Sequence, residues 1–229
     1  MIDSNPDPQE MPKAVSSTPI EDSSALHTSG ETADSTSEKP RPEDVTQWRK
    51  NMRHEIIKHR LSLSTNDRLL MTGKIILGLD TVLGNFKNKI ISVYWPFQGE
   101  PNLLYWMESI IRRGAQIALP IVIEKHNPLI FKTWAPGEKL EGGIWNIPVP
   151  VDGKRVTPDI VIAPLVAFDP HLYRLGYGGG FFDRTLASFP VKPLAIGVGY
   201  EITKIPTIFP QSYDVPMDLI VTEHQVRRR

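Results

Sequence analysis

Apolar residues recur every three or four positions across residues 43–61, which is the spacing of one stripe along an α-helix. The stripe consists of Val45, Trp48, Met52, Ile56, Ile57 and Leu61, and the opposite face is basic. A second helix is predicted over residues 67–83, with Ser64, Thr65 or Asn66 as its cap. Two shorter helices are predicted over residues 103–113, ended by Gly114, and over residues 182–188.

Between these helices lie apolar runs of the kind expected for strands of a sheet covered on both faces. They span residues 89–95, 116–123, 129–134, 159–169, 194–200 and 218–223. Because helices separate most of the strands, the crossovers should be right-handed and the sheet mostly parallel. We therefore predict an α/β fold, a single three-layer domain over residues 45–229 with helices flanking the sheet. The Pro- and Gly-rich residues 136–153 predict a long irregular loop, and such loops are often functional.

The first 44 residues of the 229-residue chain differ in composition from the rest. They contain no aromatic residue, are rich in Ser, Thr and Pro, and carry ten acidic and three basic side chains, a charge of −7. Such a segment buries too little apolar surface to offset its ordering entropy, so we predict a disordered tail. The other 185 residues hold 23 basic and 16 acidic side chains, a charge of +7. This charge suits anionic ligands, although a solubilising surface explains it equally well.

Several classes of protein are disfavoured by the same sequence. Cysteine is absent, which excludes disulfides and thiolate chemistry. No apolar run could span a membrane, and the acidic N-terminus resembles neither a secretory signal nor a transit peptide. The histidines, His126 among them, have no metal-ligand spacing and are placed at the surface, and residues 227–229 are interpreted as a frayed, solvated end. We expect a cytoplasmic monomer that binds small molecules, without nucleic acid or membrane partners.

The most informative segment is Arg-Leu-Gly-Tyr-Gly-Gly-Gly-Phe-Phe-Asp-Arg at residues 174–184, between a predicted strand and a predicted helix. Glycines allow backbone N–H groups to curl around an anion, and the N-terminus of the following helix adds its positive end. The glycines match neither the dinucleotide-binding nor the P-loop pattern, so a structural turn explains them about as well as a phosphate site. Asp183 is placed to hold Mg²⁺ against nucleotide phosphates, or simply to complement the helix dipole.

Basic residues on the first predicted helix supply a second candidate for phosphate binding. Arg49 and Arg53 lie one turn apart on the same side, and Lys50 is adjacent. Together they could clamp a triphosphate, whereas a solvated basic face is the alternative. Trp95 and Glu100 lie at the C-terminal end of a predicted strand, at the edge where ligands collect in parallel sheets.

The segment from Ala163 to Leu186 resembles the signature of the 5-formyltetrahydrofolate cyclo-ligase family, also called methenyltetrahydrofolate synthetases. The match consists of Ala-Phe-Asp at 167–169, followed by the glycine segment with its aromatic-aromatic-Asp-Arg ending. The resemblance extends over about residues 48–226. It implies a ligase that uses ATP and Mg²⁺ to convert 5-formyltetrahydrofolate to 5,10-methenyltetrahydrofolate, with release of ADP and phosphate.

The resemblance also implies roles for individual residues. Arg174 would be catalytic, and Asp183 and Asp214 would hold Mg²⁺. The ATP-binding residues would be Arg49, Lys50, Arg53, Arg174, Gly176, Tyr177, Gly178, Gly179, Gly180, Phe181 and Phe182. The folate would contact Trp95, Glu100, Tyr177 and Phe181, with the Glu100 carboxylate accepting hydrogen bonds from the donor edge of the pterin.

The chain departs from the family pattern at Pro101–Leu103, at Asn146, at Phe182, which lacks a tyrosine hydroxyl, and at Arg49, which replaces a lysine. Trp134 and Trp145 are candidate stacking partners without an assigned role. Two alternatives stay open: a non-catalytic nucleotide- or folate-binding regulator, and a sugar-phosphate isomerase that would bind phosphate without ATP.

Overall fold

The structure is a computed structural model that describes residues 42–229, with side chains from Asp44 onward. The predicted tail, residues 1–44, lies outside the described residues except for its last three, which begin helix α1 (Pro42–Ser62). None of the helices within the described residues has the length and apolar character needed to cross a membrane.

The main sheet of the described domain has eight strands with a parallel centre. In spatial order they are β12 (Val226–Arg228), β11 (Leu219–Val221), β10 (Leu194–Val198), β7 (Ile160–Pro164), β1 (Ile90–Ser92), β2 (Gln116–Ile121), β3 (Ile130–Trp134) and β6 (Arg155–Val156). The five strands from β11 to β2 are parallel, and Ile91 of β1 pairs with Ile160 and Ile117 on its two sides. Strands β12, β3 and β6 pair antiparallel with their neighbours. The predicted mostly parallel sheet is confirmed.

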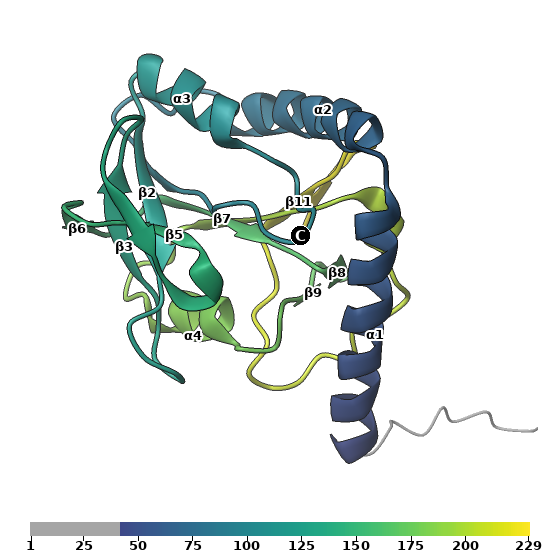
Figure 1. The fold of residues 1–229 in the computed structure, drawn as a ribbon. Helices are drawn as coiled ribbons and strands as arrows, with labels where there is room; N and C mark the ends of the chain where they lie inside the picture. The colour runs from purple at the N-terminus through teal and green to yellow at the C-terminus, as the bar shows by residue number, and fades with distance from the viewer. Residues whose placement is uncertain (1–41) are drawn as a thin grey trace, which may run out of the picture. The chain divides into compact units, whose positions relative to one another are not determined.

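Helices cover both faces of this sheet, as Figure 1 shows. Helices α2 (Thr65–Leu83) and α3 (Leu104–Arg112) pack on one face, in the core cluster that contains Ile160 and Ile162. Helix α4 (Phe181–Ser188) packs on the other face, in the cluster that contains Val161 and Ala163. Because neighbouring strand residues point to opposite faces, a continuous apolar run serves both layers. This arrangement confirms the three-layer prediction.

Helix α1 lies beside a small hairpin rather than on a face of the main sheet (Figure 1). Its Met52 and Ile56 pack against Ala167 and Leu175 of the two-stranded sheet formed by β8 (Ala167–Phe168) and β9 (Arg174–Leu175). The prediction of one strand over residues 159–169 is therefore wrong, because the chain leaves the main sheet after Pro164 and pairs again in this hairpin. Since the hairpin returns directly into the glycine segment, it places that segment next to α1.

Two further predictions are corrected by backbone pairing. Residues 136–153 contain a hairpin of β4 (Leu140–Gly142) and β5 (Pro148–Pro150), with a short turn at Ile144–Asn146 between the strands. The C-terminal arginines do not fray, because β12 pairs with β11. Arg227 also forms an ion pair with Glu201 and lies over the ring of Phe168.

The cap of α2 is Ser64, whose hydroxyl accepts a hydrogen bond from the Asp67 N–H.

Candidate active site

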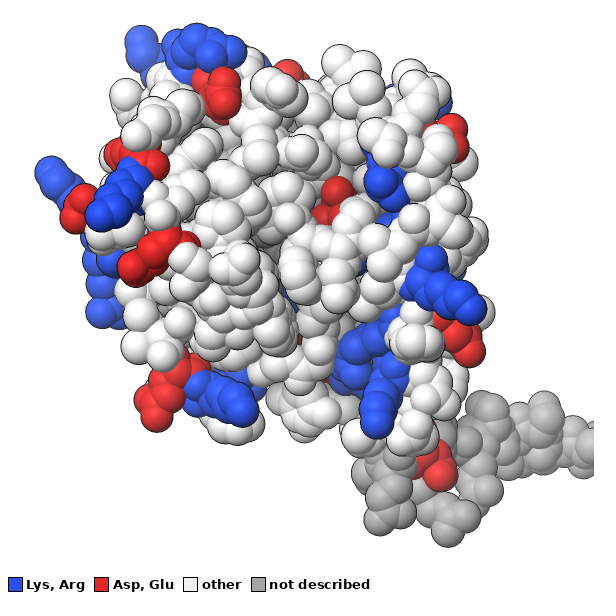
Figure 2. All heavy atoms as spheres, in the orientation of Figure 1, with Lys and Arg blue, Asp and Glu red and all other residues white. Residues whose placement is uncertain are grey.

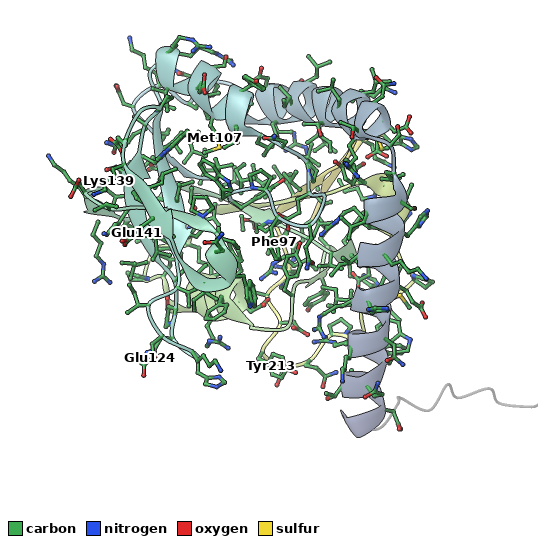
Figure 3. All side chains as sticks on the ribbon, in the orientation of Figure 1. Phe97, Met107, Glu124, Lys139, Glu141 and Tyr213 are labelled. Atoms are coloured by element: carbon green, nitrogen blue, oxygen red, sulfur yellow. The ribbon has the colours of Figure 1, made fainter. Side chains whose placement is uncertain are left out.

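A cavity of about 800 Å³ lies at the carboxyl ends of the central strands, where open α/β sheets bind ligands. Its walls come from α1, the segments that follow β1 and β2, the β4–β5 hairpin and the glycine segment. Figure 3 shows Phe97 between α1 and that hairpin. Tyr213 lies closer than Phe97 to the N-terminal end of α1 in this view. Every predicted site residue lines this cavity except Lys50, which is exposed and outside the lining.

The glycine segment and Arg53 form one end of the cavity. Gly178 and Gly180 have φ values of 97° and 64°, which other residues rarely adopt, and Gly180 leads directly into α4. Arg53 donates from Nε to the Gly176 carbonyl at 2.7 Å. Burial and the nearby Arg49 lower the pKa of Arg53. A cation that is partly desolvated beside a second cation favours an anionic ligand, so this end of the cavity suits phosphate. Figure 2 shows basic side chains gathered beside α1 on this face, next to largely uncharged surface in the middle.

Each carboxylate predicted to hold Mg²⁺ is paired with an arginine of the cavity. Asp183 accepts from Arg174 at 3.0 Å through Oδ2 and from the Val215 N–H at 3.2 Å through Oδ1. Asp214 accepts from Arg49 and from the Gln211 N–H. Arg174 is buried, and its Nε has no hydrogen-bond partner among the residues that the structure describes. These pairs order the four side chains around the glycine segment.

The donor set fits a magnesium ion that arrives with a nucleotide. The described residues contain no group of three or more His, Cys, Asp or Glu side chains that could hold a metal unaided. Mg²⁺, however, is commonly held by one or two carboxylates together with phosphate oxygens and water. Asp183 and Asp214 both line the cavity, and a carboxylate has lone pairs beyond those used by its arginine.

Another part of the cavity is built around a buried carboxylate. Glu100 is 5% exposed, and its Oε1 accepts from the Tyr177 hydroxyl at 2.7 Å while its Oε2 accepts from the Phe97 N–H at 2.9 Å. Arg60 donates to the same Tyr177 hydroxyl at 2.6 Å. Burial raises the pKa of Glu100 to about 7, although Arg60 and the two hydrogen bonds act in the opposite direction. This carboxylate is therefore poised to change charge near neutral pH.

Aromatic rings line the space above Glu100. Phe97 and Trp145 are nearly parallel, with centroids 6.1 Å apart, and Tyr177 lies 5.6 Å from Phe97. Trp95 also lines the cavity and packs edge-on against Trp134, which is not among the lining residues. The cavity thus offers flat apolar faces next to one acceptor, a combination that suits a polar heterocycle.

Several lining or supporting residues were not predicted. His126 is exposed, as the sequence interpretation predicted, but it also lines the cavity with Lys125, in the segment between β2 and β3. Its position after the carboxyl end of a parallel strand was the available signal. Arg60 was overlooked although it lies on the same helix as Arg53, because its partners belong to loops distant in sequence.

The description "5-formyltetrahydrofolate cyclo-ligase family" belongs to a family model that matches residues 45–223. The chain belongs to this family. It is 30% identical over 187 residues to a 5-formyltetrahydrofolate cyclo-ligase of Haemophilus influenzae, covering 77% of this chain and 98% of that protein. The family resemblance inferred from the glycine segment is thereby confirmed, and with it the expectation of a ligase.

Solved structures agree with this assignment. The NMR structure of the Aquifex aeolicus 5,10-methenyltetrahydrofolate synthetase matches with a TM-score of 0.69 and 31% identity, over 79% of this chain and 92% of that one. A 5,10-methenyltetrahydrofolate synthetase from Mycoplasma pneumoniae matches with a TM-score of 0.64, over 76% of this chain and 98% of that one. At 24% identity, the second match supports the fold alone.

Proposed function

We propose that the protein converts 5-formyltetrahydrofolate to 5,10-methenyltetrahydrofolate, with ATP and Mg²⁺ as requirements and ADP and phosphate as the other products. The observation that carries the proposal is a single cavity with two chemically different parts. One part is cationic and lined by glycines, and the other is apolar with a buried carboxylate. A reaction between a nucleotide and a heterocycle needs both parts within reach of each other.

The nucleotide phosphates would bind at the glycine segment. Arg53 and Arg174 line this part of the cavity and supply positive charge there, which is suited to phosphate oxygens. Arg49 donates to the Ile208 and Phe209 carbonyls and to Asp214, so its contribution would be to hold Asp214 in place. The sequence-derived role of Lys50 remains a prediction, and its exposed position outside the lining argues for a minor one.

The pterin end of the folate would lie against the aromatic side chains. Phe97, Trp145 and Tyr177 provide apolar ring faces, and the Glu100 carboxylate provides an acceptor for N–H groups of the heterocycle. An acceptor that is buried except toward the cavity discriminates strongly, because a ligand without matching donors leaves it unpaired.

The chemical difficulty is that a formamide carbon is a weak electrophile and its oxygen a poor leaving group. Attack of the formyl oxygen on the γ-phosphorus of ATP forms a P–O bond and releases ADP. Folate N10 then attacks the activated carbon, loses its proton to water, and the C–O bond breaks with departure of phosphate. Arg53, Arg174 and the loop amides are suited to stabilise charge on the moving phosphoryl group. When bound, Mg²⁺ supplies further positive charge there, and Asp183 and Asp214 are the residues that would hold it.

The test is ADP formation by the purified protein with ATP, Mg²⁺ and 5-formyltetrahydrofolate, compared with reactions lacking each component. The proposal requires ADP and methenyltetrahydrofolate in equal amounts, and only in the complete reaction. Binding of both ligands without turnover would instead favour the regulator. Binding of a sugar phosphate without any use of ATP would favour the isomerase. The cytoplasmic location and the monomeric state remain predictions.

A further inference from the structure

A chain of three polar side chains lies beneath the aromatic wall of the cavity. Arg60 donates from a terminal nitrogen to the Tyr177 hydroxyl at 2.6 Å, and that hydroxyl lies 2.7 Å from Oε1 of Glu100. Because a guanidinium cannot accept hydrogen bonds, the direction of the chain is fixed. The Tyr177 oxygen accepts from Arg60, and the Tyr177 proton is left to point at Glu100.

Arg60 is itself held rigidly. Its side chain is fully buried, at 1% exposure, and it donates from Nε to the Gln98 carbonyl at 2.9 Å and from its other terminal nitrogen to the Leu165 carbonyl at 3.2 Å. One side chain of α1 therefore joins the segments that follow β1 and β7 to the glycine segment. A donor fixed in this way also fixes the hydroxyl to which it donates.

We propose that Arg60 and Tyr177 are positioning residues that hold the Glu100 carboxylate as an aimed hydrogen-bond acceptor for the folate. The inference rests on the proposed function and adds a residue, Arg60, and a role for the Tyr177 hydroxyl. With one oxygen bound by Tyr177 and the other by the Phe97 N–H, the carboxylate cannot rotate, and its remaining lone pairs are available to N–H groups of a ligand.

The charges around Glu100 give this arrangement a measurable consequence. Burial favours the protonated form, whereas Arg60, the Tyr177 hydroxyl and the Phe97 N–H favour the carboxylate, and the resulting pKa is about 7. Tyr94 also lies nearby, but its hydroxyl donates to the Pro101 carbonyl. Removing the Tyr177 hydroxyl or weakening Arg60 therefore raises the pKa of Glu100 further. A protonated carboxyl presents a donor where the folate needs an acceptor. As the pH falls, folate binding should therefore begin to weaken at a higher pH in these variants than in the wild type.

The experiment compares wild type, Tyr177→Phe, Arg60→Lys and the double variant between pH 6 and pH 9. The measured quantity is kcat/KM for 5-formyltetrahydrofolate at saturating ATP and Mg²⁺, followed by ADP release. Losing one hydrogen bond to a carboxylate changes its proton affinity by about tenfold. We expect Tyr177→Phe to lose about tenfold in kcat/KM at pH 6 and less than about threefold at pH 9. Tyr173→Phe, which removes a hydroxyl outside the cavity, serves as the matched control and should follow the wild-type curve.

Coupling between the two residues distinguishes positioning from simple structural support. If Arg60 acts through Tyr177, adding Arg60→Lys to Tyr177→Phe should lower kcat/KM by no more than about twofold. Equal losses at every pH, or independent losses that multiply in the double variant, would overturn the proposal. Should Arg60→Lys fail to fold, the pH profile of Tyr177→Phe decides alone.

A second readout needs no turnover. The ¹³C signal of the Glu100 carboxyl, identified by its absence in Glu100→Gln, should titrate near pH 7 in the free protein and at higher pH in Tyr177→Phe. An unchanged midpoint in Tyr177→Phe would overturn the positioning role. If the wild type makes no ADP with 5-formyltetrahydrofolate, the proposed function fails, while this titration still reports on the hydrogen-bond chain.

Discussion

Replacing Asp183 with Asn tests the catalytic end of the cavity most sharply. Asp183 and Arg174 form an ion pair at 3.0 Å with side-chain exposures of only 13% and 3%. Asparagine keeps the size and can still accept hydrogen bonds, but Arg174 becomes a buried cation without its counter-charge. Losing a charge-assisted hydrogen bond costs about 1.5–3 kcal/mol. For a domain of this size, about 2 kcal/mol corresponds to a Tm lower by roughly 4–8 °C, which leaves the protein folded at 25 °C.

Turnover should respond far more strongly than stability. A neutral amide oxygen is a weaker ligand for a hard cation, so Asp183→Asn should lower kcat at limiting Mg²⁺ by about 100-fold or more. Binding of ATP without Mg²⁺ should not weaken, because the change removes negative charge beside the phosphates. The assays are differential scanning calorimetry, ADP release across a Mg²⁺ series, and calorimetric ATP titration in EDTA.

Asp159→Asn is the matched control for this substitution. Asp159 precedes β7 at the opposite end of the strand from the cavity, and its ion pair with Lys89 is exposed. This control should leave kcat and its Mg²⁺ dependence unchanged. Turnover of Asp183→Asn within threefold of wild type at limiting Mg²⁺ would refute the metal role and leave Asp183 as a structural partner of Arg174.

Three further predictions follow from the same geometry. Arg53→Ala should weaken ATP binding by about 10- to 100-fold, the loss of one charge-assisted contact, and leave folate binding within about threefold; calorimetric titrations showing equal losses for both ligands would contradict this. A chain that begins at Pro42 should keep wild-type kcat and KM, because every described lining residue lies at Thr46 or beyond; a large loss in a folded truncation would implicate the tail. Glu100→Gln should abolish folate turnover, and its free energy of unfolding relative to the wild type should rise by about 2–3 kcal/mol between pH 5 and pH 8.5, measured by urea unfolding. The sign follows from the raised pKa of Glu100: its stabilising contribution is fully present below the unfolded value of 4.5 and is lost as the pH rises through about 7, so the wild type loses stability relative to the variant over this range.

Local patterns were sufficient to predict the helices and the parallel sheet. The predicted second helix, residues 67–83, begins within two residues of α2, because helical periodicity and a capping serine are both encoded nearby. The run at residues 159–169 was misassigned, because continuous hydrophobicity does not distinguish a sheet strand from a buried hairpin. Likewise, the pairing of β12 with β11 depends on a tertiary contact that three consecutive arginines do not suggest.

The candidate site likewise has a part that the sequence could predict and a part that it could not. The glycine segment and its neighbours, Arg174 and Asp183, could be found from sequence because they lie within eleven consecutive positions. The ion pair between them could not be predicted, because Asp183 was assigned to Mg²⁺ and Arg174 to ATP. In the hydrogen-bond chain beneath the aromatic wall, Tyr177 is 117 positions from Arg60 and 77 positions from Glu100 in the sequence. Only the three-dimensional fold brings Arg60, Tyr177 and Glu100 together.

The most direct test of the proposed mechanism follows the formyl oxygen itself. 5-Formyltetrahydrofolate labelled with ¹⁸O in the formyl group is incubated with ATP, Mg²⁺ and the protein, and the released phosphate is analysed by mass spectrometry. Because the formyl oxygen is proposed to attack the γ-phosphorus and leave with it, each phosphate should carry one ¹⁸O atom. Unlabelled phosphate, formed together with methenyltetrahydrofolate, would show that ATP is hydrolysed by water and would contradict phosphoryl activation of the formyl oxygen.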